Sequence, residues 1–353
     1  MENDCYIDLL CEMIRMKPVS RDIAAVNRVQ RRVQEFLTEK GLYCTMEKDG
    51  EREILFAATA PGKVQDILLC AHLDVVPAEV ESQYEPYIEG DFLYGRGSSD
   101  CMGNAIAIMK AMCSAPAGAS LGCIFTGDEE IGGETTAYMV KNGYSARKLG
   151  LVMDSGGSVY YSQKGILNLT LTAHGSGGHS SRPWAFDNPV IKLINALQKL
   201  FAQWENPADA NDWRISMAPT ILRAGNAVNR IPDTAVAELN LRLVKLEEKE
   251  AVIEHIRQVT GLEVETGESC DPFTSPVESE EMKAVIAAYT KAFGREVTPA
   301  RMCGATDARH LYKIGVPVYI SGVNGSGAHS IEEKLEISSI DKGAAMILEL
   351  INK

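Results

Sequence analysis

Hydrophobic residues in the first 160 positions follow two alternating patterns. Residues 3–40 carry apolar side chains at helical spacing, and Gly41 is a helix-stop residue. Three later runs are short and almost continuously apolar, which is typical of strands buried on both faces. Apolar helices are predicted at 104–113 and near 135–142, so the order β-α-β-α-β predicts a mixed, mostly parallel sheet flanked by helices. The predicted strands are 67–73, 121–125 and 149–153.

The pattern changes after residue 164. From 166 to 173 apolar and polar residues alternate, as in a strand with one buried face. A helix with one apolar face is predicted at 188–204, and the segments that follow complete a β-α-β-β-α-β order, which is typical of a ferredoxin-like α+β domain. These segments are strands at 219–223 and 235–244, a helix at 247–259 and a short strand at 262–265.

The α/β pattern returns after about residue 275. A helix is predicted at 280–293 with Ser279 as its N-cap, then a strand at 316–320 and a last helix from Ile340. The simplest organisation is one α/β domain that is interrupted by an inserted α+β domain. The predicted parts are 1–164 and 275–353 for the α/β domain and 165–274 for the insertion.

Composition and charge limit the classes of protein. The chain has 353 residues, about twice the length of a usual domain, and 45% of them are hydrophobic, which excludes disorder as the main state. The net charge of −13 argues against a nucleic-acid-binding surface, because neutralising phosphates requires an excess of Lys and Arg. The same acidity disfavours binding to anionic membranes, and no apolar run approaches the roughly 20 residues that span a bilayer.

The nine cysteines are scattered along the chain and form no CxxC pair. A thiolate zinc site or a thioredoxin-like pair is therefore not predicted. The N-terminus has early acidic residues and no long apolar core, so it does not resemble a signal peptide. We expect reduced thiols and a cytoplasmic location.

Histidine and acidic residues stand where the predicted strands end, and such ends form the ligand sites of open α/β sheets. Taken singly, each has an ordinary interpretation as a hydrogen-bonded strand end, a helix cap or a solvated loop. Taken together, they are a set of imidazole and carboxylate ligands that suits Zn²⁺, with Mn²⁺ or Co²⁺ as alternatives. Five ligands favour two metal ions that share one carboxylate. The candidates are His72, Asp100, Glu130, Asp154 and His329.

Six short motifs give the chain a resemblance to a known family. They are HLDVVP, GRGSSDCMG, GDEEIGG, GHSSRP, NRIP and a late GAH. In this order and spacing, from about residue 65 to 335, the chain resembles the M20 metallopeptidases, which include glutamate carboxypeptidase, aminoacylase, desuccinylase and cytosolic dipeptidases. The resemblance implies a hydrolase of amide bonds with two divalent metal ions.

The resemblance also implies how the ligands divide between two metals, with Asp100 bridging. The implied ligands are His72, Asp100 and Asp154 for one metal and Asp100, Glu130 and His329 for the other. Glu129 is implied to be the general base that takes a proton from the metal-bound water, and Asp74 to orient His72. A non-proline cis peptide is implied at Asp100–Cys101.

For the insertion, the resemblance implies a lid that also forms a homodimer. His179 is implied to reach the partner subunit's active site and stabilise the oxyanion there. Asn229 and Arg242 are implied to bind polar groups of the substrate, and the fork of Arg242 suits a carboxylate. A loop of the second half is implied to bind substrate through Gly304, Ala305 and Thr306.

Two departures from the family's commonest pattern bear on the substrate. Asp154 stands where many acylases of the family have Glu, which favours a peptidase over an acylase. The sequence CGATDAR stands where many relatives have a Gly-Gly-Thr run. Our leading hypothesis is hydrolysis of a dipeptide, short peptide or N-acyl amino acid that bears a free carboxylate. The alternatives are an N-acyl-amino-acid deacylase, such as an aminoacylase or desuccinylase, and a non-catalytic metal- or peptide-binding protein.

Overall fold

The computed structural model describes residues 5–351, in which the chain forms two compact units. The first unit runs to Ser162 and continues with Thr274–Arg301 and the residues from Thr306. The second consists of Gln163–Phe273 and Met302–Ala305. The last segment was expected in the first domain. Residues 1–4 and 352–353, which the predicted first helix and α/β domain include, lie outside the described residues.

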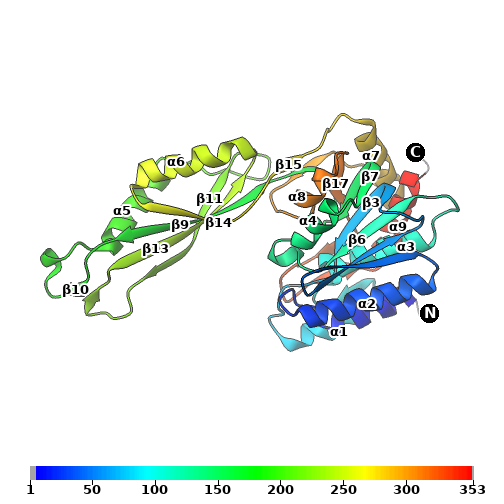
Figure 1. Ribbon diagram of the computed structural model, residues 1–353, viewed down its shortest axis with the longest axis horizontal. Helices are drawn as coiled ribbons and strands as arrows, with labels where there is room; N and C mark the ends of the chain where they lie inside the picture. The colour runs from blue at the N-terminus through cyan, green and yellow to red at the C-terminus, as the bar shows by residue number, and fades with distance from the viewer. Residues whose placement is uncertain (1–4, 352–353) are drawn as a thin grey trace. The chain divides into compact units, whose positions relative to one another are not determined.

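The first unit is built on the expected mixed sheet (Figure 1), whose strand order is β1-β2-β6-β3-β7-β17-β8-β15, with β16 beside β8. The central strands β6, β3, β7 and β17 are parallel, β1 and β2 pair antiparallel with their neighbours, and β8 pairs antiparallel with β17. The strands are β1 Tyr43–Asp49, β2 Arg52–Ala58, β3 Val64–His72, β6 Leu121–Thr126, β7 Ser145–Met153, β8 Tyr160–Gln163, β15 Phe273–Thr274, β16 Ala300–Met302 and β17 Val318–Ser321.

Helices cover both faces of this sheet. Apolar side chains of α1, α2, α3, α7 and α9 share one core with alternate residues of the strands, because successive strand side chains point to opposite faces. Leu149 and Leu151 belong to this core, whereas the intervening Gly150 faces Leu311 of α8. The helices are α1 Cys5–Arg15, α2 Ile23–Glu39, α3 Gly103–Cys113, α4 Glu134–Lys141, α7 Glu280–Phe293, α8 Ala308–Leu311 and α9 Ser338–Ile351.

Helix ends follow the capping chemistry of the sequence. The predicted N-cap Ser279 accepts a hydrogen bond from the amide of Met282 at 3.1 Å, and α7 begins at the next residue as expected. The predicted helical stretch 3–40 is interrupted between α1 and α2, where Lys17 adopts a φ of 52° immediately before Pro18. The second helix restarts after Asp22, whose carboxylate accepts the amide of Ala25.

The sequence patterns missed β8, β15 and β16 at one end of the large sheet, and two further groups of strands in the first unit. One is the antiparallel hairpin β1–β2 at the edge of the large sheet. The other is a small sheet with the order β18-β19-β5-β4, which joins the segment before α3 to the segment before α9. Its strands are β4 Tyr87–Glu89, β5 Phe92–Tyr94, β18 Gly325–Ser326 and β19 Lys334–Glu336.

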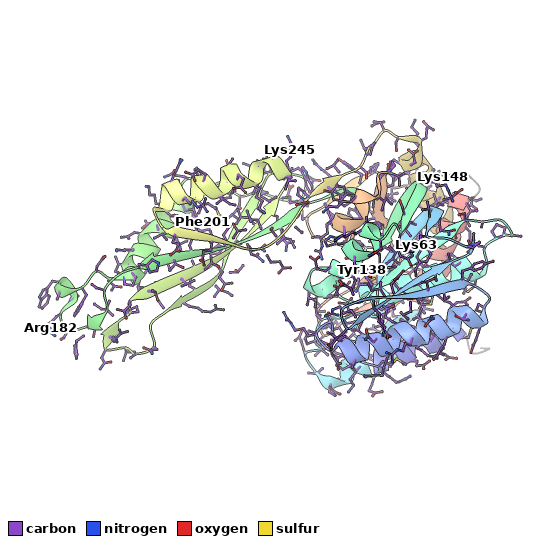
Figure 2. The ribbon with its side chains drawn as sticks, in the orientation of Figure 1. Lys63, Tyr138, Lys148, Arg182, Phe201 and Lys245 are labelled. Atoms are coloured by element: carbon purple, nitrogen blue, oxygen red, sulfur yellow. The ribbon has the colours of Figure 1, made fainter. Side chains whose placement is uncertain are left out.

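The second unit has the expected β-α-β-β-α-β order, with an antiparallel sheet in the order β11-β13-β9-β14. Helices α5 and α6 lie side by side on one face (Figure 1). Phe201, at the end of α5, packs against their core (Figure 2). The elements are β9 Gly165–His174, α5 Pro189–Phe201, β11 Ser216–Ala224, β13 Thr234–Leu243, α6 Lys249–Thr260 and β14 Glu263–Cys270, with the short pair β10 Gly178–His179 and β12 Arg230–Ile231.

All nine cysteines are free thiols, and three of them, Cys70, Cys101 and Cys123, are buried. Among the described residues, no helix has the length and apolar character needed to cross a bilayer. The cytoplasmic location stays a prediction.

Candidate metal centre

The carboxyl ends of the parallel strands bring the predicted ligands to one edge of the sheet. His72 is the last residue of β3, Asp154 follows β7, and Glu129 and Glu130 follow β6. Because parallel strands end at the same edge, side chains distant in sequence meet there. Asp100 joins them from the turn before α3 and His329 from the loop after β18.

Asp100 lies between the two histidines. Its Oδ1 is 3.1 Å from Nε2 of His72, and its Oδ2 is 3.1 Å from Nε2 of His329. Each carboxylate oxygen therefore faces a different imidazole, which is the arrangement of a carboxylate that bridges two cations. His329 adopts a φ of 64°, a backbone conformation that is uncommon for residues other than glycine.

A further carboxylate lies beside each histidine. Asp154 Oδ1 is 3.4 Å from Nε2 of His72, and Glu130 Oε1 is 3.0 Å from Nε2 of His329. Zinc bonds of about 2.0–2.2 Å in a tetrahedron put neighbouring donor atoms about 3.3 Å apart, so these spacings match ligands around a cation. The structure thus brings all five predicted ligands together.

The tautomer of His72 is itself an argument for a cation. Nδ1 of His72 lies 2.9 Å from the carbonyl oxygen of Asp74, and a carbonyl can only accept, so Nδ1 carries the proton. In a neutral ring, Nε2 then presents a lone pair to the carboxylates of Asp100 and Asp154. A divalent cation between these three groups would remove the repulsion, and the donor set therefore fits a metal.

The pKa values of the cluster also indicate that its side chains fit a metal ion. Burial raises the pKa of Asp154 to about 7, with the neighbouring Asp100 carboxylate adding to the effect and His72 opposing it. Hydrogen bonds to Asp100 and Glu130 raise the pKa of His329 to about 10. Burial opposes ionisation of Asp100, but its hydrogen bonds with His329 and His72 lower its pKa. Cations would compete with protons for the same atoms.

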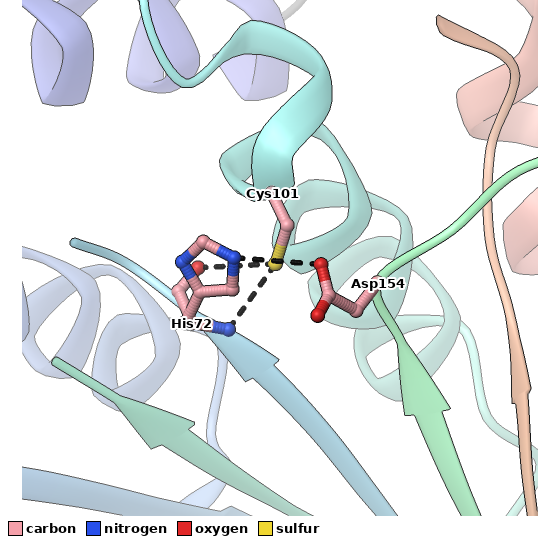
Figure 3. Close-up of side chains that lie close together, drawn as sticks. All are labelled: His72, Cys101 and Asp154. Carbon is pink, nitrogen blue, oxygen red and sulfur yellow. Dashed lines mark hydrogen bonds and ion pairs between the residues drawn. The ribbon is translucent and has the colours of Figure 1, made fainter. Parts of the chain in front are cut away.

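Cys101 also lies at this site, although the sequence patterns did not single it out. Its sulfur, a nitrogen of His72 and an oxygen of Asp154 lie within 4.8 Å of one another (Figure 3). The thiol is already held by the backbone of His72, at 3.2 Å from its nitrogen and 3.3 Å from its oxygen. Burial strongly raises the pKa of this thiol, so Cys101 acts as a contact between strand and turn.

Backbone contacts hold the ligand-bearing turns. The carboxylate of Asp74 accepts the amides of Glu129 and Glu130, at 3.2 and 3.4 Å, and so joins the end of β3 to the loop after β6. Burial opposes ionisation of Asp74, but its interaction with His72 keeps its pKa lowered. Asp74 therefore contacts both a predicted ligand and the predicted base.

A buried ion pair missed by the sequence patterns holds the turn of Asp100. Arg96 and Glu333 are paired at 2.7 Å, and each side chain is 1% exposed. Glu333 also accepts the amides of Ser99 and Asp100, at 3.1 and 3.2 Å. The sequence carries one indication of this pair, which is that both residues lie near predicted ligands. Arg96 is in the glycine-rich turn before Asp100, and Glu333 follows His329 by four residues. The predicted cis peptide at Asp100–Cys101 is present.

The second unit holds three other predicted residues. The exposed His179 and Asn229 lie close together, because the amide of Ser180 donates to the carbonyl of Asn229 at 3.0 Å. Arg242 is half-buried near the other end of β13, eight residues from Thr234 and so about 26 Å along the strand. The structure therefore brings the first two together and places Arg242 apart from them.

The predicted substrate loop is divided between the units. Gly304 and Ala305 belong to the second unit, and Thr306 begins the last segment of the first. The hydroxyl of Thr306 accepts the amide of Ala308 at 3.2 Å, and the residue is 4% exposed. That oxygen thus has a structural partner at the start of α8.

The fold and site define an amide-bond hydrolase of the metallopeptidase class, and comparisons with known proteins agree. The family model for Peptidase family M20/M25/M40 matches residues 68–353. A succinyl-diaminopimelate desuccinylase from Rhodospirillum centenum is 28% identical, over 95% of this chain and 93% of that protein. The chain therefore belongs to the M20/M25/M40 peptidase family.

Solved structures have the same fold. A metallo-carboxypeptidase of the M20 family from Sulfolobus solfataricus aligns with a TM-score of 0.81 at 19% identity, covering 99% of each chain. A Bacillus subtilis protein described as a dinuclear metal binding peptidase of the family aligns with a TM-score of 0.67 at 15% identity, covering 99% of this chain and 98% of that one. The family thus includes dinuclear metal-binding members.

The centre predicts that divalent cations stabilise the fold. At a free concentration of 100 times Kd, Zn²⁺, Mn²⁺ or Co²⁺ should raise the free energy of unfolding by about 2.7 kcal/mol per site, because the ions bind the assembled ligands only. Thermal unfolding in chelator and after metal is restored measures this. The gain should shrink in His329→Ala and persist in Glu332→Gln, an exposed neighbour. Equal unfolding temperatures with and without metal would contradict the site.

Proposed function

We propose that this chain is a two-metal hydrolase that cleaves an amide bond of a dipeptide, short peptide or related small substrate with a free carboxylate. The main observation behind this proposal is the position of Asp100, which has one carboxylate oxygen toward each histidine. Glu129 lies in the loop after β6. We propose zinc as the metal, with manganese and cobalt as alternatives, because the donors are imidazoles and carboxylates. His72, Asp100 and Asp154 would hold one ion, and Asp100, Glu130 and His329 the other.

Glu129 is proposed to be the general base. The bound ions would supply a water of lowered pKa and polarise the scissile carbonyl. Burial raises the pKa of Glu129 well above its usual range, with Asp154 adding to the effect and His72 and Arg309 opposing it. A carboxylate in such surroundings can accept a proton and return it to the leaving amine. Glu129 and the ligand Glu130 thus take different roles, although they are adjacent.

The second unit is proposed to complete the site as a lid and homodimer interface. Ile191 and Ile194 are each 54% exposed on α5, and β11 pairs with β13 alone among the described strands. An open strand edge and exposed apolar residues on the same unit both favour pairing with a second copy. In such a dimer, His179 would stabilise the oxyanion in the partner's site. Substrate polar groups would be bound by Asn229, Arg242, Gly304 and Thr306.

Deacylation of an N-acyl amino acid is the second candidate. The desuccinylase relative favours it. The shorter side chain of Asp154, compared with the glutamate of many acylases, favours a peptidase. Both reactions hydrolyse an amide next to a carboxylate, so the same residues serve either one.

Replacing the base separates catalysis from metal binding. Glu129→Gln should lower kcat by about 10²–10⁴-fold, because the amide cannot accept the proton, while metal content is unchanged. The matched control is Glu134→Gln, an exposed glutamate at the start of α4, which should keep the wild-type rate. Full turnover by Glu129→Gln with its metals bound would refute the assigned mechanism.

A substrate panel decides between the two reactions. Dipeptides and tripeptides should give higher kcat/KM than N-acetyl and N-succinyl amino acids if Asp154 marks a peptidase. Amidated counterparts of each substrate should react more slowly, because the free carboxylate loses its partner. A preference for N-succinyl substrates would make the deacylase the correct assignment, and no turnover across the panel would favour a binding protein.

The dimer can be tested by complementation. Glu129→Gln and His179→Ala should each be poorly active, but refolding an equal mixture should restore about a quarter of wild-type activity. Half of the dimers are then mixed, and each has one intact site. Mixing Glu129→Gln with the Glu129→Gln, His179→Ala double variant should restore nothing. A fully active monomeric His179→Ala would contradict the shared site.

A further inference from the structure

A buried arginine contacts the residue proposed as the base. Arg309 lies in α8, a short helix of the first unit, and its side chain is 5% exposed. We propose that Arg309 is the positioning residue for Glu129, fixing its carboxylate beside the metal centre. This inference rests on the proposed role of Glu129 and adds a residue to which the motifs assign no part in catalysis.

The contacts of one guanidinium nitrogen carry the inference. Nη2 of Arg309 donates to the carbonyl oxygen of Glu129 at 3.2 Å and lies 3.5 Å from Oε1 of the same residue. The Glu129 side chain is 10% exposed, so water screens this pair weakly. A single side chain therefore holds both the backbone and the carboxylate of Glu129.

Glu129 is held from its other side as well. Its amide donates to Oδ1 of Asp74 at 3.2 Å, while its carbonyl accepts from Arg309. With both backbone groups fixed, the remaining freedom lies in the side chain. In this proposal the guanidinium holds Oε1, which it approaches to 3.5 Å, and Oε2 is the oxygen that takes the proton. A general base gains rate when it is fixed within reach of its proton.

The segment around Arg309 is fitted closely to this loop. Nε2 of His310 lies 2.9 Å from the carbonyl oxygen of Gly132, and the hydroxyl of Thr126 donates to Oδ2 of Asp307 at 2.8 Å. A Cβ on Gly133 would lie 2.1 Å from Oδ1 of Asp307 and 3.2 Å from Nη2 of Arg309. Only glycine permits this approach, so the 307–310 segment forms a fixed support for the base.

The chemistry of arginine makes the role specific. The guanidinium is planar and rigid, and its Nε lies 3.3 Å from Nε2 of His310 while Nη2 reaches Glu129. Lysine has a single ammonium on a flexible chain, and this chain is one atom shorter. Arg309→Lys therefore keeps the positive charge but loses the contact with His310 that aims the donor, and its nitrogen falls short of the position of Nη2. A positioning role therefore predicts a loss of rate that conserved charge does not restore.

Steady-state kinetics of Arg309→Lys and Arg309→Gln test the proposal. We expect kcat to fall by about 10–100-fold, because a small displacement of a reacting group costs that much, with KM unchanged and wild-type metal content. Arg31→Lys, which alters an arginine paired with Glu53 away from the site, is the control and should behave as wild type. Normal kcat in both variants overturns the proposal. Loss of metal or of folding in both also overturns it, because Arg309 would then be structural.

A double-variant cycle shows whether Arg309 acts through Glu129. In the Glu129→Gln background, adding Arg309→Lys should not lower the residual rate further. An independent, multiplicative loss would overturn the positioning role. If Glu129→Gln itself turns over normally, the proposed base is wrong. If that variant is inactive while both Arg309 variants are normal, the base stands and the positioning role alone fails.

Discussion

The site depends on one carboxylate between two imidazoles. Asp100 faces Nε2 of His72 and Nε2 of His329, both at 3.1 Å, and the other ligands are arranged around these contacts. The fold fixes Asp100 through its backbone, since Glu333 accepts its amide and pairs with the buried Arg96. The parallel strands then supply His72, Asp154 and Glu130 at one edge of the sheet, because parallel strands end together.

Assembling this edge costs stability, which the bound ions would offset. The side chain of Asp154 is 8% exposed, and its burial, together with the Asp100 carboxylate, raises its pKa to about 7. Its ionised form is therefore disfavoured without a cation nearby. Sites of this kind break local rules of folding in order to perform chemistry. The proposed base is also held by its backbone, since Asp74 accepts the amide of Glu129 and Arg309 donates to its carbonyl. Ligands and base thus share their supports.

The sheet, the inserted α+β unit and the five candidate ligands could be predicted from the sequence, because apolar runs mark buried strands and reactive residues follow their ends. The small sheet β18-β19-β5-β4 could not, since strands of two or three residues carry no period. Glu333 and Arg309 were missed for another reason. A charged residue in a polar segment is usually exposed, and the burial of these two follows from contacts over 237 and 180 positions of the chain.

The number of metal ions bound per chain decides whether Asp100 bridges two of them. Chelator-treated protein is dialysed against Zn²⁺, Mn²⁺ or Co²⁺, and elemental analysis then counts the ions bound per chain. The wild type should bind two ions. Glu130→Ala should bind one, because Glu130 serves a single ion, and Asp100→Ala should bind both more weakly. A wild-type protein that holds one ion or none, or an Asp100→Ala variant that still holds two as tightly, would contradict the bridging role of Asp100.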